Sequence, residues 1–407
     1  MKFAKLSLAA IMAMGISAFA DVKVSGDVKV YYGTNDADKW DGVLGNAQTT
    51  PPSTHTPSDA SLFGQDNSYA NAAVSIDAET ELADSIKAKV GFTMLETMGL
   101  ESSIVSDVWA GSKVGSQMWF DEANLQGTVF DKTAVIFGRQ YLDTPMVFSE
   151  RWNIAANSYD AAVVADSHLE KTTLVAAWVM RSNVNGGATV ATDDRFGGQP
   201  FTTFGDNGAY AFGAVTTAIP MTTAQAWYYA VDSVATAYWL QADVTPDIDS
   251  DMKLEIGVQF AGTALSHKIN DDATVWAAKV GVNVAGFDIS GAYSSADKGD
   301  LGFTNVGGAQ SKLYTEAWWN YGYVSAPDTD AYNVSISYMA EGIAKLGAYY
   351  TATDSNDRGE DLTEFTLTAD KSFGAFDAAL AYIYTDAENQ NNDDAFNTVQ
   401  VYLTYNF

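Results

Sequence analysis

The chain has 407 residues with a net charge of −29, made up of 51 acidic and 22 basic side chains, and it contains no cysteine. Such acidity argues against nucleic acid as a partner, because phosphate binding needs clustered lysine and arginine. Without cysteine there is no disulfide framework, no thiolate metal site and no cysteine nucleophile.

The N-terminal residues predict a secretory signal peptide. Lys2 and Lys5 precede an apolar run that begins at Leu6 and ends in the small-x-small cleavage pattern of residues 18–20. This run is too short for a comfortable membrane-spanning helix of ~20 residues. We therefore expect residues 1–20 to be removed and residues 21–407 to form a single exported domain.

After the signal peptide, apolar and polar residues alternate in one segment after another. In DVKVSGDVKVYYG the valines occupy even positions, and Lys23, Asp27 and Lys29 occupy odd positions. This period of two is typical of strands with one apolar and one polar face. Eighteen such segments are predicted, at residues 22–33, 69–81, 85–95, 117–129, 133–143, 158–166, 171–181, 208–218, 223–231, 234–244, 251–262, 272–284, 287–296, 331–340, 343–353, 361–371, 376–385 and 396–407.

The connections between these segments alternate in length. Joints such as LADS, FDK, AEG and FGA are short, whereas those at residues 34–68, 96–116, 182–207 and 297–330 are long. Short turns on one side and long loops on the other are typical of bacterial outer-membrane barrels. The sequence therefore predicts an all-β fold, a transmembrane antiparallel β-barrel of about eighteen strands. A soluble β-sandwich is the alternative, but it does not account for the export signal and the one-sided loops together.

The last segment, VQVYLTYNF, ends on a bare aromatic residue. Its apolar residues Val399 to Phe407 alternate with polar ones, so the terminus should be tied into a sheet. The terminal aromatic residue resembles the signal that outer-membrane barrels present to their insertion machinery. We expect Phe407 to serve as this assembly signal and the last strand to pair with the first.

The segment at residues 136–181 carries the most specific motifs. It contains Gly138-Arg139-Gln140 at the end of one strand, Asp143-Thr144-Pro145 at the start of a loop, and Asn157-Ser158-Tyr159-Asp160 before the next strand. These motifs resemble the OprD-type porins and the major outer-membrane porins of the epsilon class of proteobacteria. The resemblance implies an eighteen-stranded channel whose third extracellular loop, Thr144–Ser158, folds inward and narrows the lumen.

The same resemblance implies the residues of the constriction. Glu150 and Arg151 would project into the pore, with Asp160 and Asp166 on the strand that follows. Arg139 has the parity of lipid-facing Val135 and Phe137, yet a bulge at Gly138 would turn it inward. We favour the inward position; the alternative is a place at the outer rim with the side chain extended toward water.

The polar faces of the strands predict a lumen of mixed charge. A one-residue slip would turn charged side chains into lipid, at a cost of roughly 2–4 kcal/mol for a lysine at the bilayer midplane. The pore-lining residues expected on this basis are Lys87, Lys89, Glu122, Lys253, Glu255, Lys279, Lys345 and Glu364. Because most of the excess acid lies in loops and turns, we expect a passive channel for ions and small polar solutes with a weak preference for cations.

Other functions remain as alternatives. A structural or adhesive outer-membrane barrel without significant transport is the main one. A catalytic barrel is disfavoured, because His55, His168 and His267 are the only histidines and lie in loops or turns. We expect no cofactor and no dedicated metal site. Calcium weakly bound at the acidic loops is the alternative. The segment DSNDRGED at residues 354–361 resembles the start of a calcium loop but has Arg358 at a ligand position.

The expected location is the outer membrane of a Gram-negative bacterium. The expected partners are outer-membrane lipid and lipopolysaccharide, small hydrophilic solutes and ions, and the barrel-insertion machinery. Large porins usually form homotrimers, so a homotrimer is a further expectation.

Overall fold

The computed structural model describes residues 22–38, 60–96, 99–100, 104–105, 117–183, 201–249, 252–267, 271–308, 310–356 and 361–407. The predicted signal peptide, His55 and residues 357–360 of the acidic segment lie outside these ranges. Within them, no helix is long and apolar enough to cross a membrane.

The alternating segments form strands, and these strands build one sheet. The strands are β1 Lys23–Asn35, β2 Ser68–Ala83, β3 Ile86–Glu96, β4 Gln117–Val129, β5 Thr133–Gln140, β6 Tyr159–Asp166, β7 Thr172–Ser182, β8 Thr202–Thr203, β9 Ala209–Thr216, β10 Thr222–Val231, β11 Ala235–Val244, β12 Met252–Leu265, β13 Ala273–Val284, β14 Phe287–Ala296, β15 Thr329–Ala340, β16 Ala344–Ser355, β17 Leu362–Phe373, β18 Phe376–Ala387 and β19 Phe396–Asn406. Short helical turns lie at Gln65–Asn67, at Tyr321–Val324 (α2) and at Asn391–Asp393. Each of the eighteen predicted segments corresponds to one of these strands, and the two-residue β8 is additional.

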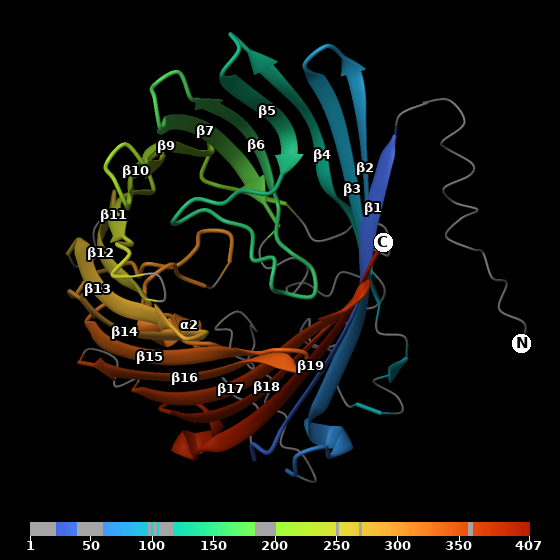
Figure 1. Cartoon of the computed structure of the whole chain (residues 1–407), viewed down its shortest axis with the longest axis vertical. Coiled ribbons are helices and arrows are strands. Elements are labelled where there is room, and N and C mark those ends of the chain that lie inside the picture. Colours follow the sequence, from blue (N-terminus) through green and yellow to red (C-terminus); the bar gives the residue numbers. More distant parts are fainter. Residues whose placement is uncertain are drawn as a thin grey trace, which may run out of the picture.

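The eighteen longer strands close on themselves as an antiparallel barrel (Figure 1). The short β8 pairs only with the end of β7, and β7 pairs directly with β9. Closure is made by β1 and β19, whose register runs from Asp27 opposite Asn406 to Asn35 opposite Thr398. Two backbone hydrogen bonds extend this pairing, from Gly26 N–H to Phe407 O (2.9 Å) and from Phe407 N–H to Gly26 O (3.0 Å). The predicted pairing of the first and last strands is confirmed. No sheet edge remains between β1 and β19, so the usual exposed edge of an open sheet is removed.

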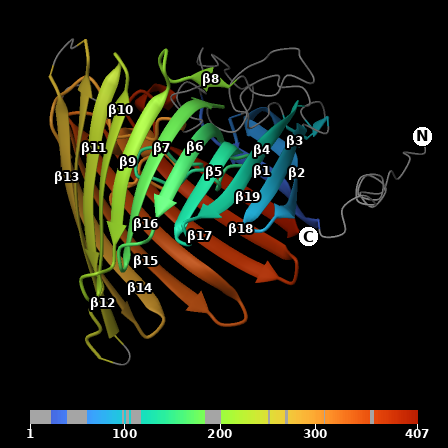
Figure 2. The ribbon, with the colours of Figure 1, turned by 90° about the horizontal axis from the view of Figure 1, so that it is seen from above.

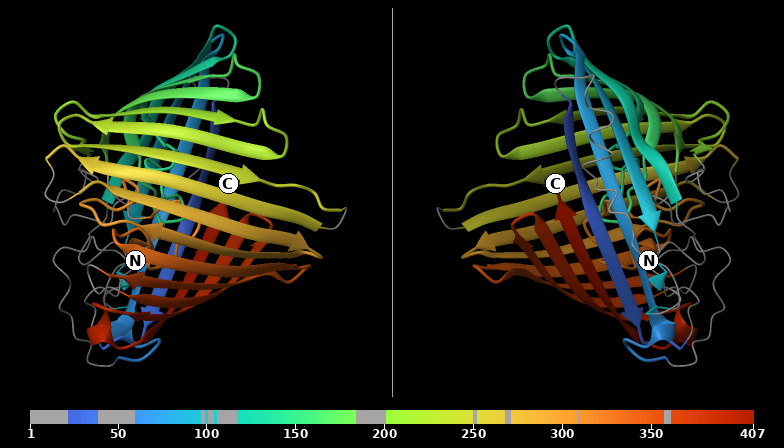
Figure 3. Two further views of the ribbon diagram at one scale, coloured as in Figure 1. Left: turned by 90° about the vertical axis from the view of Figure 1, so that its left-hand side faces the viewer. Right: turned by 90° about the vertical axis from the view of Figure 1, so that its right-hand side faces the viewer.

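The pleat of most strands places polar or small residues inside and large apolar residues outside, although a few large side chains such as Trp239 also face inward. Val258 and Phe260 of β12, for example, are exposed on the outer face, whereas Gln259 between them is buried inside. The strands are inclined to the barrel axis, as Figures 2 and 3 show from the side. This alternation of faces is what a barrel with an apolar exterior requires.

The interior of the barrel is partly filled by chain. Figure 1 shows the segment between β5 and β6 crossing the inside of the ring, and the segment that contains α2, between β14 and β15, lies there too. The inward course of the third loop was predicted. The second inward segment was not, and together the two form the candidate site.

Candidate functional site

The third loop begins as a small hairpin directly after β5. Thr144 N–H donates to Val147 O (3.0 Å) and Ser149 N–H donates to Leu142 O (2.8 Å), so the chain reverses around Pro145. Asn157 then fixes the return of the loop toward β6. Its Oδ1 accepts from Glu150 N–H (2.7 Å) and its Nδ2 donates to Phe148 O (3.1 Å). The loop is therefore held in a defined shape by its own backbone and by one asparagine.

A second loop, residues 297–328, holds the third loop in place. Asn305 of this loop donates from Nδ2 to Phe148 O (2.7 Å) and accepts at Oδ1 from Phe148 N–H (3.0 Å). Val306 N–H donates to Met146 O (2.9 Å), and Tyr159 OH donates to Phe148 O (2.8 Å). The hydrogen bonds that the side chains of Asn305 and Tyr159 make with the backbone of Phe148 are buried, so they are protected from competition by water.

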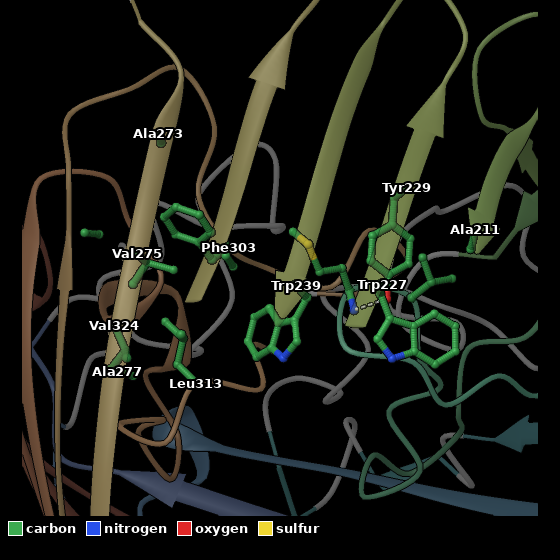
Figure 4. Close-up of a cluster of buried hydrophobic side chains, with 14 of the residues drawn as sticks. Ala211, Trp227, Tyr229, Trp239, Ala273, Val275, Ala277, Phe303, Leu313 and Val324 are labelled. Atoms are coloured by element: carbon green, nitrogen blue, oxygen red, sulfur yellow. Dashed lines mark hydrogen bonds between the residues drawn. The ribbon is translucent and has the colours of Figure 1, made fainter. Parts of the chain in front are cut away.

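Apolar packing fixes both loops against one half of the wall. Figure 4 shows Phe303 and Leu313 of the 297–328 loop beside Trp239 of β11 and Val275 of β13, in one buried cluster. Met146 of the third loop joins this cluster, and its N–H donates to the hydroxyl of Tyr229 on β10 (3.4 Å). The inward positions of the wall here are mostly small, and this leaves room for the loops. The small inward residues are Ala161, Ala177, Ala209, Ala211, Ala261, Ala273 and Ala277.

The other end of the 297–328 loop is tied to β17 by a buried carboxylate. Glu364, 1% exposed, accepts hydrogen bonds from Trp319 N–H (3.1 Å), Asn320 N–H (2.8 Å) and Asn320 Nδ2 (2.8 Å). Trp319 is buried and meets Trp152 of the third loop edge to face, with ring centroids 6.4 Å apart. Glu364 does face the lumen side of its strand, as expected, but it serves as a loop anchor rather than as an open wall residue.

The two loops leave a cavity of about 650 Å³ between themselves and the opposite wall. Arg151 and Trp152 line it from the third loop, and Tyr314 and Glu316 line it from the 297–328 loop. The wall contributes polar and aromatic side chains from β1, from β14 to β17 and from β19. They are Lys29, Ser290, Asn333, Ser335, Tyr349, Asp370, Gln400, Tyr402 and Thr404.

Glu316 is an unusual acid within this lining. Ser311 donates to its carboxylate from both the backbone N–H (3.2 Å) and the hydroxyl. Enclosure by protein raises the pKa of Glu316 well above its usual value, and the nearby Glu150 and Glu364 raise it further, although the Ser311 hydrogen bonds oppose this. The neutral form of this side chain is therefore favoured over a wider pH range than for a free glutamate.

Paired charges cover the wall formed by β2, β3 and β4. Lys89 contacts Glu122 and lies 3.6 Å from Asp77, while Lys87 bonds Glu79 at 3.0 Å. On the opposite wall Lys279 lies 3.3 Å from Glu255. Lys87, Lys89, Glu122, Glu255 and Lys279 therefore occupy the lumen side of their strands, mostly as neutral pairs.

The two remaining wall lysines lie near the short-turn end. Lys253 is well exposed and lies 3.9 Å from Asp247 of the preceding turn. Lys345 is exposed close to the turn that precedes β16, opposite Asp370 of β17. Both positions are at the mouth of the barrel rather than at its centre.

Arg139 and Asp160 were expected at the pore constriction, but both lie on the outer face of the barrel. Gly138 has a φ of +122°, but the register between β4 and β5 continues without a shift, with Ala123 opposite Arg139. Arg139 therefore keeps the outward parity of Phe137, and its Nε bonds Asp160 Oδ1 at 2.8 Å on that outer face. Neither side chain reaches the lumen, so the inward position for Arg139 was wrong.

Asp166 and Glu150 also differ from their expected roles. Asp166 lies at the short-turn end of β6, far from the third loop, where it accepts from Thr133 Oγ1 (2.6 Å) and contacts the ring of His168 at 2.7 Å. Glu150 is in the third loop but is 2% exposed, and its Oε1 accepts from Gln310 N–H at 2.8 Å. It joins the two loops instead of projecting into open space.

Arg151 alone among the expected constriction residues borders the cavity. It is exposed, and its guanidinium carbon lies 4.3 Å from the ring centroid of Tyr141. Tyr141 in turn donates to Oδ2 of Asp121 (2.7 Å), which lies on β4 in the wall of paired charges. Among the described residues, no group of three or more histidines and carboxylates is placed to hold a metal ion.

Sequence reasoning missed Asn305, Glu316 and the whole inward course of residues 297–328. Two signals pointed to it: the run WWNY at residues 318–321 is too apolar for a loop in water, and the inward alanines of β12 and β13 leave space unfilled. A large apolar group normally finds a buried place.

The sequence matches no protein-family model and no curated protein. Its fold, however, is that of solved outer-membrane proteins. OpdK of Pseudomonas aeruginosa, solved with vanillate, superimposes with a TM-score of 0.74 at 10% identity, over 96% of this chain and 99% of that one. OccAB4 of Acinetobacter baumannii gives 0.73 at 13% identity, over 96% and 98%. OccK8 (OprE) of P. aeruginosa gives 0.71 at 13% identity, over 96% and 98%.

Proposed function

We propose that this protein is a passive outer-membrane channel for ions and small polar solutes, with an aperture set jointly by the third loop and the 297–328 loop. The observation that carries the proposal is the cavity of about 650 Å³ that both loops line together with the barrel wall. An eighteen-stranded barrel encloses more space than its wall side chains fill, so the loops determine what remains open. The solved barrels of the same fold support this proposal as porins of the OprD type.

The outer membrane of a Gram-negative bacterium is the proposed location. The exposed outer face is apolar, with residues such as Phe137, Phe212 and Val258 more than half exposed. Such a face would be unfavourable in water over a whole barrel and suits the hydrocarbon region of a bilayer.

A weak cation preference is part of the proposal. The wall pairs of Lys87, Lys89 and Lys279 with their carboxylates are close to neutral, so they contribute little selectivity. The net charge of −29 lies mostly outside these pairs and attracts cations toward the channel mouths. Salt weakens this attraction, because the Debye length is about 10 Å at 0.1 M.

The test is the current through the purified, refolded protein in a planar bilayer. Stepwise channels, with a reversal potential of cation sign across a tenfold KCl gradient, are expected. A potential of anion sign would overturn the charge argument but keep the channel. Folded, heat-modifiable protein without any conductance would contradict the channel and favour a structural or adhesive barrel instead.

A further inference from the structure

Three charged side chains meet on the outer face of the barrel, where β5, β6 and β7 approach the long loops. Asp160 lies between two arginines. Arg139 bonds it through Nε (2.8 Å) and Nη2 (3.3 Å), and Arg181 bonds it through Nη2 (2.5 Å). Two positive charges and one negative charge leave an excess of one positive charge on this patch, in a protein whose net charge is −29.

A β-bulge gives Arg181 its outward direction. The register between β6 and β7 shifts after Ala161, which pairs with Val179, so that Asp160 pairs with Arg181 and Met180 is the extra residue. Val179 is 1% exposed and faces the lumen. Without the bulge, Arg181 would share that inward face, because side chains alternate along a strand. The chain thus places this arginine on the outside through a specific local irregularity.

The two arginines differ in how many of their N–H donors are already hydrogen-bonded. Arg139 also donates from Nη1 to Phe120 O (2.8 Å), and its guanidinium carbon lies 3.5 Å from the ring centroid of Phe201. Arg181 is 43% exposed, and within the part of the chain that the structure describes its hydrogen bond to Asp160 uses one N–H. A guanidinium has five N–H donors, so Arg181 has donors left for an external acceptor.

The surroundings of Arg181 are apolar. A pocket of about 410 Å³ adjoins it, lined by Phe120, Phe137, Ala162, Trp178 and Met180 among others. Phe120 is 54% and Phe137 is 61% exposed on the outer face. A binding partner that fits must be anionic at one end, to meet the remaining N–H donors of Arg181, and apolar at the other. An arginine fork matches phosphate, like carboxylate, in a bidentate manner.

We propose that Arg181, held in place by Asp160 and Arg139, binds a phosphate group of an outer-leaflet glycolipid on the outer wall of the barrel. Asp160 and Arg139 act as positioning residues, because they fix the guanidinium at the level of the headgroups. The lipid's acyl chains lie against Phe120 and Phe137. The inference rests on the proposed membrane orientation, in which the long loops face outward, and does not depend on conductance.

Lipid binding by the refolded full-length protein in detergent tests this proposal. The probes are diphosphoryl lipid A, the same lipid A after enzymatic removal of both phosphates, and phosphatidylglycerol, with bound lipid counted by native mass spectrometry. We expect diphosphoryl lipid A to bind best and Arg181→Gln to weaken it about tenfold, as loss of a charge-assisted fork predicts. Arg181→Lys should be intermediate, and Lys132→Gln, at a short turn on the opposite end, should bind as the unaltered protein does.

Three other results would contradict the role of Arg181 or the identity of the lipid. Equal binding of the dephosphorylated lipid, or unchanged binding by Arg181→Gln, would show that the arginine only neutralises Asp160. Stronger binding of phosphatidylglycerol would reject the glycolipid as the source of the phosphate. If Arg181→Gln does not fold, as judged by heat modifiability, Arg181→Lys decides the question alone. Conductance of Arg181→Gln should be unchanged, so a failure of the lipid site and a failure of the channel are separable.

Discussion

Asn305 bonds both backbone groups of Phe148, a residue 157 positions earlier in the chain. Its amide donates to the carbonyl at 2.7 Å and accepts from the N–H at 3.0 Å, much as a neighbouring strand would. Asn305 is therefore one of the buried links between the two long loops inside the barrel, together with Glu150, which accepts from Gln310 N–H. Both loops border the cavity, so under the proposed function this contact helps to set the aperture.

Removing this contact should loosen the aperture. Asn305→Ala deletes the two buried hydrogen bonds to Phe148 and those that the same side chain makes with Glu150 and Tyr159. The backbone groups of Phe148 are left with fewer partners, at a cost of roughly 1–3 kcal/mol to loop docking. We expect larger and noisier single-channel currents with an unchanged barrel melting transition. Asn356→Ala, at an exposed position between β16 and β17, is the matched control. Currents identical to those of the unaltered protein would show that the loops are held by apolar packing alone.

Glu364 should be the second fixed point of the 297–328 loop. Glu364→Ala leaves the N–H groups of Trp319 and Asn320 without their acceptor in a buried place, which costs roughly 2–4 kcal/mol of loop docking. Glu364→Gln keeps an accepting oxygen and should be milder. Limited proteolysis of refolded protein measures the release of the loop, with Glu341→Ala in an exposed turn as control. Equal resistance of Glu364→Ala and the control would refute the anchor.

The raised pKa of Glu316 predicts a loop that is more firmly docked in acid. For a carboxyl whose pKa in the folded protein exceeds its unfolded value, the stabilising contribution is complete below that unfolded value, near 4.5, and is lost as pH rises through the raised pKa. Current noise should therefore increase as pH rises above 4.5, the unfolded value. Glu316→Gln should remove the pH dependence of the current noise, and the noise should stay low at high pH. A dependence of the same size in Glu316→Gln would assign it to another group.

Lys89 should moderate the attraction of the lumen for cations. In Lys89→Met the carboxylates of Asp77 and Glu122 lose their partner, so the wall becomes more negative. The reversal potential should shift further in the cation direction, more at 0.1 M than at 1 M salt because of screening. Lys132→Met, in an exposed turn, removes the same charge outside the lumen and should shift the potential less. An equal shift in both variants would mean that only net charge matters.

The barrel itself could be predicted almost completely from the sequence. Each strand repeats the same two-residue alternation, and the strong cost of a charged residue on the outer face fixes its register, as at Lys253 and Glu255. Strand ends differ by a few residues because hydrogen bonding continues past the last alternating side chain, as it does in β12 to Leu265.

The interior could be predicted only in part. Loop contacts such as Asn305 with Phe148 are long-range and leave no periodic pattern. The expected bulge was at Gly138, whereas the register shifts among the described strands lie in β2, at Leu82, in β4, around Asp121, and in β7, at Met180. A bulge reverses the face of every later side chain in a strand, so its position decides whether a charge lines the lumen. Arg139 points outward because the pairing of β4 with β5 has no register shift next to it. Arg181 points outward because the extra residue Met180 turns it to the other face of β7.

The most direct test of the central claim uses the absence of cysteine from the chain. Arg151→Cys places a single thiol on the third loop at the edge of the cavity, and Glu341→Cys places one in an exposed turn. A bulky methanethiosulfonate reagent is added while single channels are recorded. If the loops set the aperture, each modification of Arg151→Cys lowers the current in a step, while Glu341→Cys and the unaltered protein do not respond. An Arg151→Cys channel that is fully modified yet conducts as before would contradict the account.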